Sequence, residues 1–88
     1  MDRRSLYNKS IANFIDNFDK FVNKEETENF LVLNKPAWVP SHRDNHYPLG
    51  VIDVVKMMRN DSNYILPHRL DIETTGNLII LKRPEVRS

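Results

Sequence analysis

Two short, unbroken apolar runs limit most strongly what this chain can fold into. They cover residues 30–33 and 78–81 and consist of Phe, Leu, Val and Ile. Asn34-Lys35-Pro36 follows the first run, and Gly76-Asn77 precedes the second. Short apolar runs bounded by turn residues predict strands, and the first fits a strand that is buried on both faces. Because two strands do not form a stable sheet core alone, the pattern predicts a piece of a larger domain.

Helical periodicity occupies the N-terminal segment. Residues 5–24 place apolar side chains three and four positions apart, on one stripe of a helix. We expect the stripe to pack against the rest of the fold, and the alternatives are a partner protein or a membrane surface. Residues 24–28 are mostly charged and predict a solvated connector. The stripe consists of Tyr7, Ile11, Phe14, Ile15, Phe18, Phe21 and Val22.

The middle of the chain predicts a loop and then a short helix. Residues 36–50 are rich in proline and polar residues, which is typical of an irregular loop. Residues 51–58 favour a helix that ends near residues 59–61, although their β-branched side chains also fit a strand. Residues 64–66 fit either a short strand or a loop. Pro84-Glu85 predicts the start of another helix.

Composition narrows the classes of function. The chain of 88 residues has no cysteine, and 13 basic and 12 acidic residues give a net charge of +1. A disulfide framework and a thiolate metal site are therefore excluded. Any RNA binding must come from local basic patches, because the overall field is weak. No apolar run approaches the roughly 20 residues that span a bilayer, and no apolar signal segment follows the basic N-terminus. We therefore expect a soluble cytoplasmic protein.

Residues 67–76 carry the candidate chemistry. In an extended chain, Arg69 and Asp71 point to one face while Leu70 turns into the core. A neighbouring cation keeps a carboxylate ionised, and a positioned, ionised carboxylate acts as a nucleophile or a base. The hydroxyls and the glycine of residues 74–76 suit a tight turn before the next strand. From local physics alone, the alternative is a surface Arg–Asp pair beside a strand.

Two motifs in this chain resemble a known family. The sequence His68-Arg69-Leu70-Asp71-Ile72-Glu73-Thr74-Thr75-Gly76 is similar to the H-R-L-D-x-x-T-S-G signature of RluA-type pseudouridine synthases, with Thr75 in place of the usual serine. Upstream, Leu31-Val32-Leu33-Asn34-Lys35-Pro36-Ala37 resembles the "v-x-N-K-P-a-G" strand and turn of that family. Trp38 stands where glycine is common in the family. The resemblance runs from Phe30 to Glu85.

The resemblance implies an α+β fold, part of a catalytic domain with a mixed, mostly antiparallel sheet and flanking helices. Residues 1–29 are then an N-terminal amphipathic helix and connector, and residues 30–88 are the incomplete N-terminal part of the domain. Asp71 is implied as the catalytic aspartate, which acts on uridine while the base is detached and rejoined through carbon. Such enzymes flip the base out of the stack and need no metal or organic cofactor. His42 and His46 do not favour a metal site, because they lie in a proline-rich loop with no third ligand.

RNA-binding roles are also implied by the resemblance. Arg69 is expected to hold the flipped nucleotide or to fill the gap that it leaves. The active-site loop is expected to be shaped by His68, Leu70, Thr74 and Gly76. Binding of the RNA substrate is expected to involve His68, Thr74 and Thr75 as well. Lys35 has two interpretations, which are a contact with RNA phosphate and a solvated lysine at the end of a strand.

The enzymatic status of the chain stays open, because active sites of this family also use a tyrosine and a basic residue downstream of the H-R-L-D motif. One hypothesis is that the chain is part of a longer synthase that acts on rRNA or tRNA. The alternative is a complete non-catalytic remnant, or an RNA- or protein-binding module. Two chains that complete one site are disfavoured, because identical chains lack the same tyrosine. Exposed sheet edges predict oligomerisation or aggregation.

Overall fold

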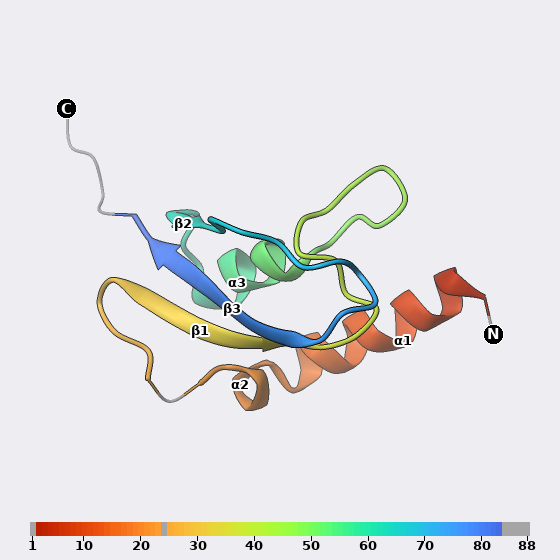
Figure 1. Ribbon diagram of the computed structural model, residues 1–88, viewed down its shortest axis with the longest axis horizontal. Helices are drawn as coiled ribbons and strands as arrows, with labels where there is room; N and C mark the ends of the chain where they lie inside the picture. The colour runs from red at the N-terminus through yellow and green to blue at the C-terminus, as the bar shows by residue number, and fades with distance from the viewer. Residues whose placement is uncertain (1, 24, 84–88) are drawn as a thin grey trace.

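The two apolar runs become neighbouring strands of one sheet in the computed structural model, which describes residues 2–23 and 25–83 (Figure 1). Strands β1 (Phe30–Lys35) and β3 (Gly76–Lys82) pair antiparallel over their full common length. The short strand β2 (Tyr64–Ile65) pairs antiparallel with the other side of β3, so the order is β1-β3-β2. The expected α+β class is confirmed, and every strand pairing in the described residues is antiparallel.

The N-terminal periodicity forms two helices rather than one. Helix α1 (Arg3–Asp16) begins earlier than expected, because the carboxylate of Asp2 caps it by accepting a hydrogen bond from the Ser5 N–H. The chain leaves helical geometry at Asn17, and the short helix α2 (Phe18–Phe21) follows. The Asn17 side-chain amide donates to the Asn13 carbonyl, which is the local competition by which asparagine interrupts helices. The predicted single helix over residues 5–24 is therefore wrong in its bounds.

The packing expected of this segment is confirmed. Tyr7, Ile11, Phe14 and Phe18 are buried in the core, and the Phe14 and Phe18 rings lie 5.7 Å apart between centroids. Figure 1 shows α1 and α2 running along the side of β1. None of the described helices combines the length and the apolar character that crossing a membrane requires.

Helix α3 (Val51–Arg59) resolves the ambiguity of the middle segment in favour of a helix. The Gly50 N–H donates to the Asp53 carboxylate at 2.9 Å, which satisfies a backbone donor at the start of the helix. Asn60 ends the helix in the left-handed conformation. The β-branched residues that suggested a strand lie on the face of α3 that is buried in the core, where they pack well.

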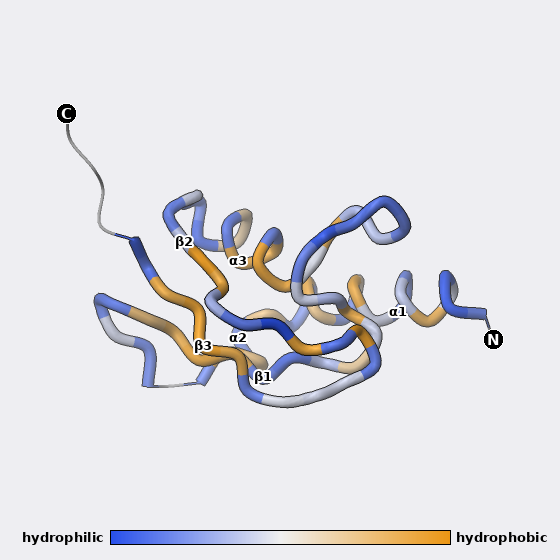
Figure 2. Tube along the Cα trace, turned by 45° about the horizontal axis from the view of Figure 1, so that its top comes forward, coloured by the Kyte–Doolittle hydropathy of each residue, from blue (hydrophilic) through white to orange (hydrophobic). Residues whose placement is uncertain are grey.

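The core lies on only one face of the sheet. Leu31, Leu33, Leu78 and Ile80 have no exposed surface, whereas the residues between them point away from the helices and Ile79 is 45 % exposed. The prediction that the first strand is buried on both faces is therefore wrong, because the helices cover a single face. Figure 2 shows the apolar colouring gathered along β1 and β3.

The connector after α2 is fastened to the sheet. Val22 forms a bridge with Leu33, and the Asn23 N–H donates to the Val32 carbonyl, so this segment covers part of the outer edge of β1. The Glu26 carboxylate then pairs with Arg59 and with Lys82, each at 2.7 Å. The connector is thus held by an ion-pair network rather than being merely solvated. The expected helix start at residues 84–85 lies outside the described residues.

Candidate active site

The H-R-L-D sequence lies in the loop that joins β2 to β3. Arg69 and Asp71 are exposed, and Leu70 between them packs against the core. This alternation is the one that the sequence predicts for an extended chain. Thr74 and Thr75 are also exposed. The loop therefore presents its polar side chains outward while Leu66 and Leu70 pack against the core.

The backbone turns directly after the aspartate. The Thr74 N–H donates to the Asp71 carbonyl at 3.0 Å, and Gly76 enters β3 with a φ of 149°, a conformation that favours glycine. Within the described residues, Asp71 forms no ion pair with Arg69. The expected cation beside the carboxylate is therefore not supplied by Arg69 in this structure.

Lys35 supplies a buried positive charge close to the loop. It continues the inward side of β1 after Leu31 and Leu33, and its exposed fraction is 0 %. Its ammonium donates to the carbonyls of Pro36 at 2.8 Å and Ile72 at 2.9 Å. The interpretation as a solvated end-of-strand lysine is therefore wrong. The predicted contact with RNA phosphate stays a prediction, and it requires the ammonium to leave these carbonyls.

The protonation of Lys35 is shifted by its surroundings. Burial lowers the pKa of Lys35 to about 8, because a desolvated ammonium is disfavoured. The negative charges of Glu73 and Asp71 act in the opposite direction and raise this pKa. The lysine is therefore electrostatically linked to the aspartate loop while its hydrogen bonds go to backbone oxygens.

Trp38 adds a second contact to the same point of the loop. Its backbone N–H donates to the Ile72 carbonyl at 2.7 Å, so this oxygen accepts from Trp38 and from Lys35. Trp38 has a φ of 67°, in the left-handed region. Glycine adopts this region without steric conflict, which explains why it is common at this position of the motif.

Ser41 holds the loop on the other side of the aspartate. Its hydroxyl donates to the Leu70 carbonyl and accepts from the Leu70 N–H, both at 2.9 Å. The side chain is 1 % exposed. Sequence reasoning missed Ser41, because nothing local distinguishes a serine in a proline-rich loop from a solvated one.

Gly50 is a second position that the sequence analysis did not single out. A Cβ atom at Gly50 would lie 2.5 Å from the carbonyl carbon of His42, so the two segments approach too closely for any side chain. The pattern of Gly50 followed three residues later by Asp53 is a capping signal that the sequence does contain.

His68 touches the sheet rather than the turn. Its Nε2 atom accepts a hydrogen bond from the Ile79 N–H at 3.3 Å, beyond the end of the short strand β2. The imidazole thus takes the place of a strand partner for β3. This contact requires the unprotonated Nε2 atom, so His68 has a structural role in addition to the predicted role at the loop.

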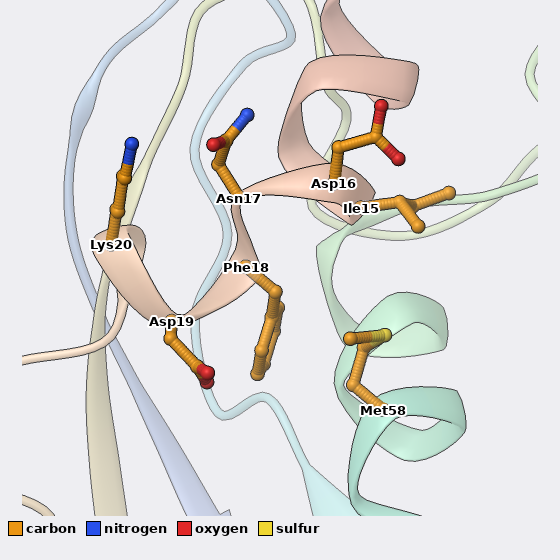
Figure 3. A pocket seen from close by; sticks show the side chains of 7 residues that line it. All are labelled: Ile15, Asp16, Asn17, Phe18, Asp19, Lys20 and Met58. Atoms are coloured by element: carbon orange, nitrogen blue, oxygen red, sulfur yellow. The ribbon is translucent and has the colours of Figure 1, made fainter.

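The part of the chain that the structure describes forms surface hollows outside this loop, and two of them are well defined. One lies between the α1–α2 junction and α3 (Figure 3), and it contains none of the predicted site residues. It is lined by Ile15, Asp16, Asn17, Phe18, Asp19, Lys20 and Met58. The other is lined by Arg3, Arg4, His46 and Tyr47, and Arg4 donates to the His46 carbonyl at 2.6 Å.

Among residues 2–23 and 25–83, no three His, Cys, Asp or Glu side chains form a metal-binding group.

Comparison with known proteins gives consistent matches. The chain is 39% identical over 59 residues to the ribosomal large subunit pseudouridine synthase C of Pasteurella multocida (strain Pm70), which covers 66% of this chain and 18% of that protein. The protein of the same name from Buchnera aphidicola subsp. Baizongia pistaciae is 37% identical over 62 residues, or 69% of this chain and 20% of its own. The Escherichia coli (strain K12) protein is 36% identical over 59 residues, or 66% and 18%. The alignments thus span 18–20% of these relatives. No family model and no solved structure matches the chain.

Proposed function

Because the chain belongs to the RluA-type pseudouridine synthase family, we propose that it takes part in the isomerisation of uridine to pseudouridine in RNA. In this proposal, residues 30–88 form the N-terminal part of a catalytic domain, and residues 1–29 form a helix and connector beside it. The names of the relatives favour RNA of the large ribosomal subunit as the substrate class. A cytoplasmic location accompanies this substrate.

Asp71 is the proposed catalytic residue. The observation that carries the proposal is that Asp71 is exposed on a loop whose backbone is fixed on both sides, through Leu70 and through Ile72. A carboxylate held in this way meets the geometric need of a nucleophile, because the reacting atom must be positioned before it attacks. The carboxylate then acts on the target uridine while the base is detached and rejoined through carbon.

The neighbouring side chains complete the proposed contacts with RNA. Arg69 is exposed one residue from the core anchor Leu70, and it is proposed to occupy or border the space left by the flipped nucleotide. Thr74 and Thr75 offer exposed hydroxyls at the turn. Active sites of this family also use a tyrosine and a basic residue. We place both roles on residues downstream of the H-R-L-D motif.

The test is a pseudouridine assay on total rRNA and tRNA with the 88-residue chain, its Asp71→Asn variant and its Asp19→Asn variant. Asp19 is an exposed acid of α2 outside the loop, so it is the matched control for loss of one negative charge. For any product that the wild-type chain forms, we expect an equal rate from the Asp19→Asn chain and a rate at least about 1,000-fold lower from the Asp71→Asn chain.

Equal rates for Asp71→Asn and the wild type reject Asp71 as the catalytic residue. A wild-type chain that is folded yet yields no product rejects catalysis by this chain alone. In that case, RNA binding measured by fluorescence anisotropy separates an RNA-binding module from a chain that has no affinity for RNA.

A further inference from the structure

A single hydroxyl takes the place of a strand partner for Leu70. The Ser41 Oγ atom accepts from the Leu70 N–H and donates to the Leu70 carbonyl, both at 2.9 Å. The Leu70 N–H belongs to the peptide plane shared with Arg69, and its carbonyl belongs to the plane shared with Asp71. One side chain therefore fixes the two peptide planes from which the two exposed polar side chains depart.

Ser41 is itself held by helix α3. Its backbone carbonyl accepts from the Ile52 N–H at 3.2 Å, and the carbonyl of Pro40 accepts from the Val51 N–H at 2.8 Å. Val51 and Ile52 are buried in the core. The hydroxyl therefore projects from backbone that is attached to the first turn of a packed helix.

The far side of Asp71 is fixed independently. The Ile72 carbonyl accepts from the Trp38 N–H at 2.7 Å and from the Lys35 ammonium at 2.9 Å. Only Asp71 lies between the two fixed residues. Loss of the contact on either side removes one restraint on the direction of the Asp71 side chain and leaves the contact on the other side and the hydrogen bond from the Thr74 N–H to the Asp71 carbonyl.

We infer that Ser41 is a positioning residue of this site, one that directs Asp71 and Arg69 toward the RNA without touching the substrate. This inference rests on the proposed function of Asp71. The buried Ser41 hydroxyl, which contacts Leu70 29 positions away in sequence, thereby sets the orientation of the adjacent Asp71 carboxylate.

The chain offers a matched control at Tyr7. The Tyr7 hydroxyl donates to the Leu49 carbonyl at 3.0 Å and accepts from the Leu49 N–H at 2.9 Å, which is the same pair of contacts in a different loop. Ser41→Ala and Tyr7→Phe each remove one hydroxyl and leave one backbone N–H and one carbonyl unpaired. The two variants differ in whether the released residue adjoins Asp71.

The experiment measures backbone order by NMR and kinetics by the pseudouridine assay. For Ser41→Ala, we expect the order parameters of Arg69 and Asp71 to fall from about 0.85 to below about 0.6. We expect kcat to fall about 100-fold with little change in KM, because a displacement of the reacting group impairs the chemical step. Tyr7→Phe is expected to release Leu49 alone and to leave the order of Asp71 and kcat as in the wild type.

Two results would overturn the inference: unchanged order at Asp71 in Ser41→Ala, or an equal loss of kcat in Tyr7→Phe. If the wild-type chain makes no pseudouridine, the proposed function of this chain fails by itself. The order parameters of Asp71 in the two variants then still decide whether Ser41 positions the loop.

Discussion

The ammonium group of Lys35 is buried, and its hydrogen-bond partners are backbone carbonyls rather than water. Its two hydrogen bonds satisfy part of the ammonium, but burial still lowers its pKa to about 8. The unfolded chain holds the proton up to the ordinary value of 10.5. Between these two values the unfolded chain carries a proton that the folded chain has lost. Stability therefore rises with pH across this window.

Replacing Lys35 with methionine tests this linkage. The wild-type free energy of unfolding is expected to increase by about 1–2 kcal/mol between pH 7 and pH 9.5, less than the full shift gives because this range ends below the pKa of the unfolded chain. The Lys35→Met variant is expected to lack this increase. Burial raises the pKa of Tyr7 above its ordinary value of 10.0, so Tyr7 stays largely protonated in the folded chain over the measured range of pH 7–9.5. Urea unfolding at the two pH values provides the measurement, and a parallel increase in both proteins would contradict the assignment.

Trp38 stores strain in the backbone at the same point of the loop. Its φ of 67° is unfavourable for any residue with a Cβ atom. Trp38→Gly and Trp38→Ala both remove the indole, but only glycine relieves the strain. We expect the glycine variant to be more stable than the alanine variant by about 1 kcal/mol, although alanine is normally the more stabilising residue. Denaturant unfolding of the two variants gives the comparison, and equal midpoints would argue against strain.

At the scale of elements, the sequence predicted β1 and β3 because their signals are local, whereas it favoured the third helix with a strand as the alternative and left β2 open between a strand and a loop. The apolar runs and their flanking turn residues identify β1 and β3, and the polar residues 59–61 indicate the end of α3. The break at Asn17 was missed because apolar periodicity continues through it. Helical spacing alone does not report where an asparagine side chain competes for a carbonyl.

The candidate site was predictable only in part, for a related reason. The exposed polar residues of the H-R-L-D loop follow from alternation about Leu70 and from the motif itself. The contacts that hold the loop join residues 29 and 37 positions apart, from Ser41 to Leu70 and from Lys35 to Ile72. No pattern in either segment encodes such partners, so Ser41 was overlooked and Lys35 was assigned an incorrect solvated alternative.

At the scale of the whole molecule, the sheet is apolar on both faces and covered on one. The strand pairing places Val32 beside Ile79 and Ile65 beside Leu81 on the face away from the helices. Ile65 and Ile79 are 39% and 45% exposed. An exposed apolar face of this kind favours association, either with further parts of a protein or between copies of the chain.

Substitutions of the neighbouring residues Ile79 and Ile80 distinguish an effect on self-association from an effect on folding. Ile79→Thr is expected to change the free energy of unfolding by less than about 0.5 kcal/mol and to reduce self-association. Ile80→Thr removes a fully buried side chain and is expected to destabilise the fold by about 2–4 kcal/mol. Sedimentation at several concentrations and thermal unfolding measure the two effects. Unchanged association of Ile79→Thr would show that this face is not the contact surface.

The contact between the N-terminal segment and β1 makes the two edges of the sheet unequal. Val22 and Asn23 occupy hydrogen-bonding positions on the outer flank of β1, whereas β2 has no strand on its far side among the described residues. Any additional strand, whether from a longer chain or from a second molecule, therefore meets a partly covered edge at β1 and an edge at β2 on which the described residues place no strand. Extension of this sheet is therefore easier on the side of β2, the strand that leads into the loop carrying Asp71.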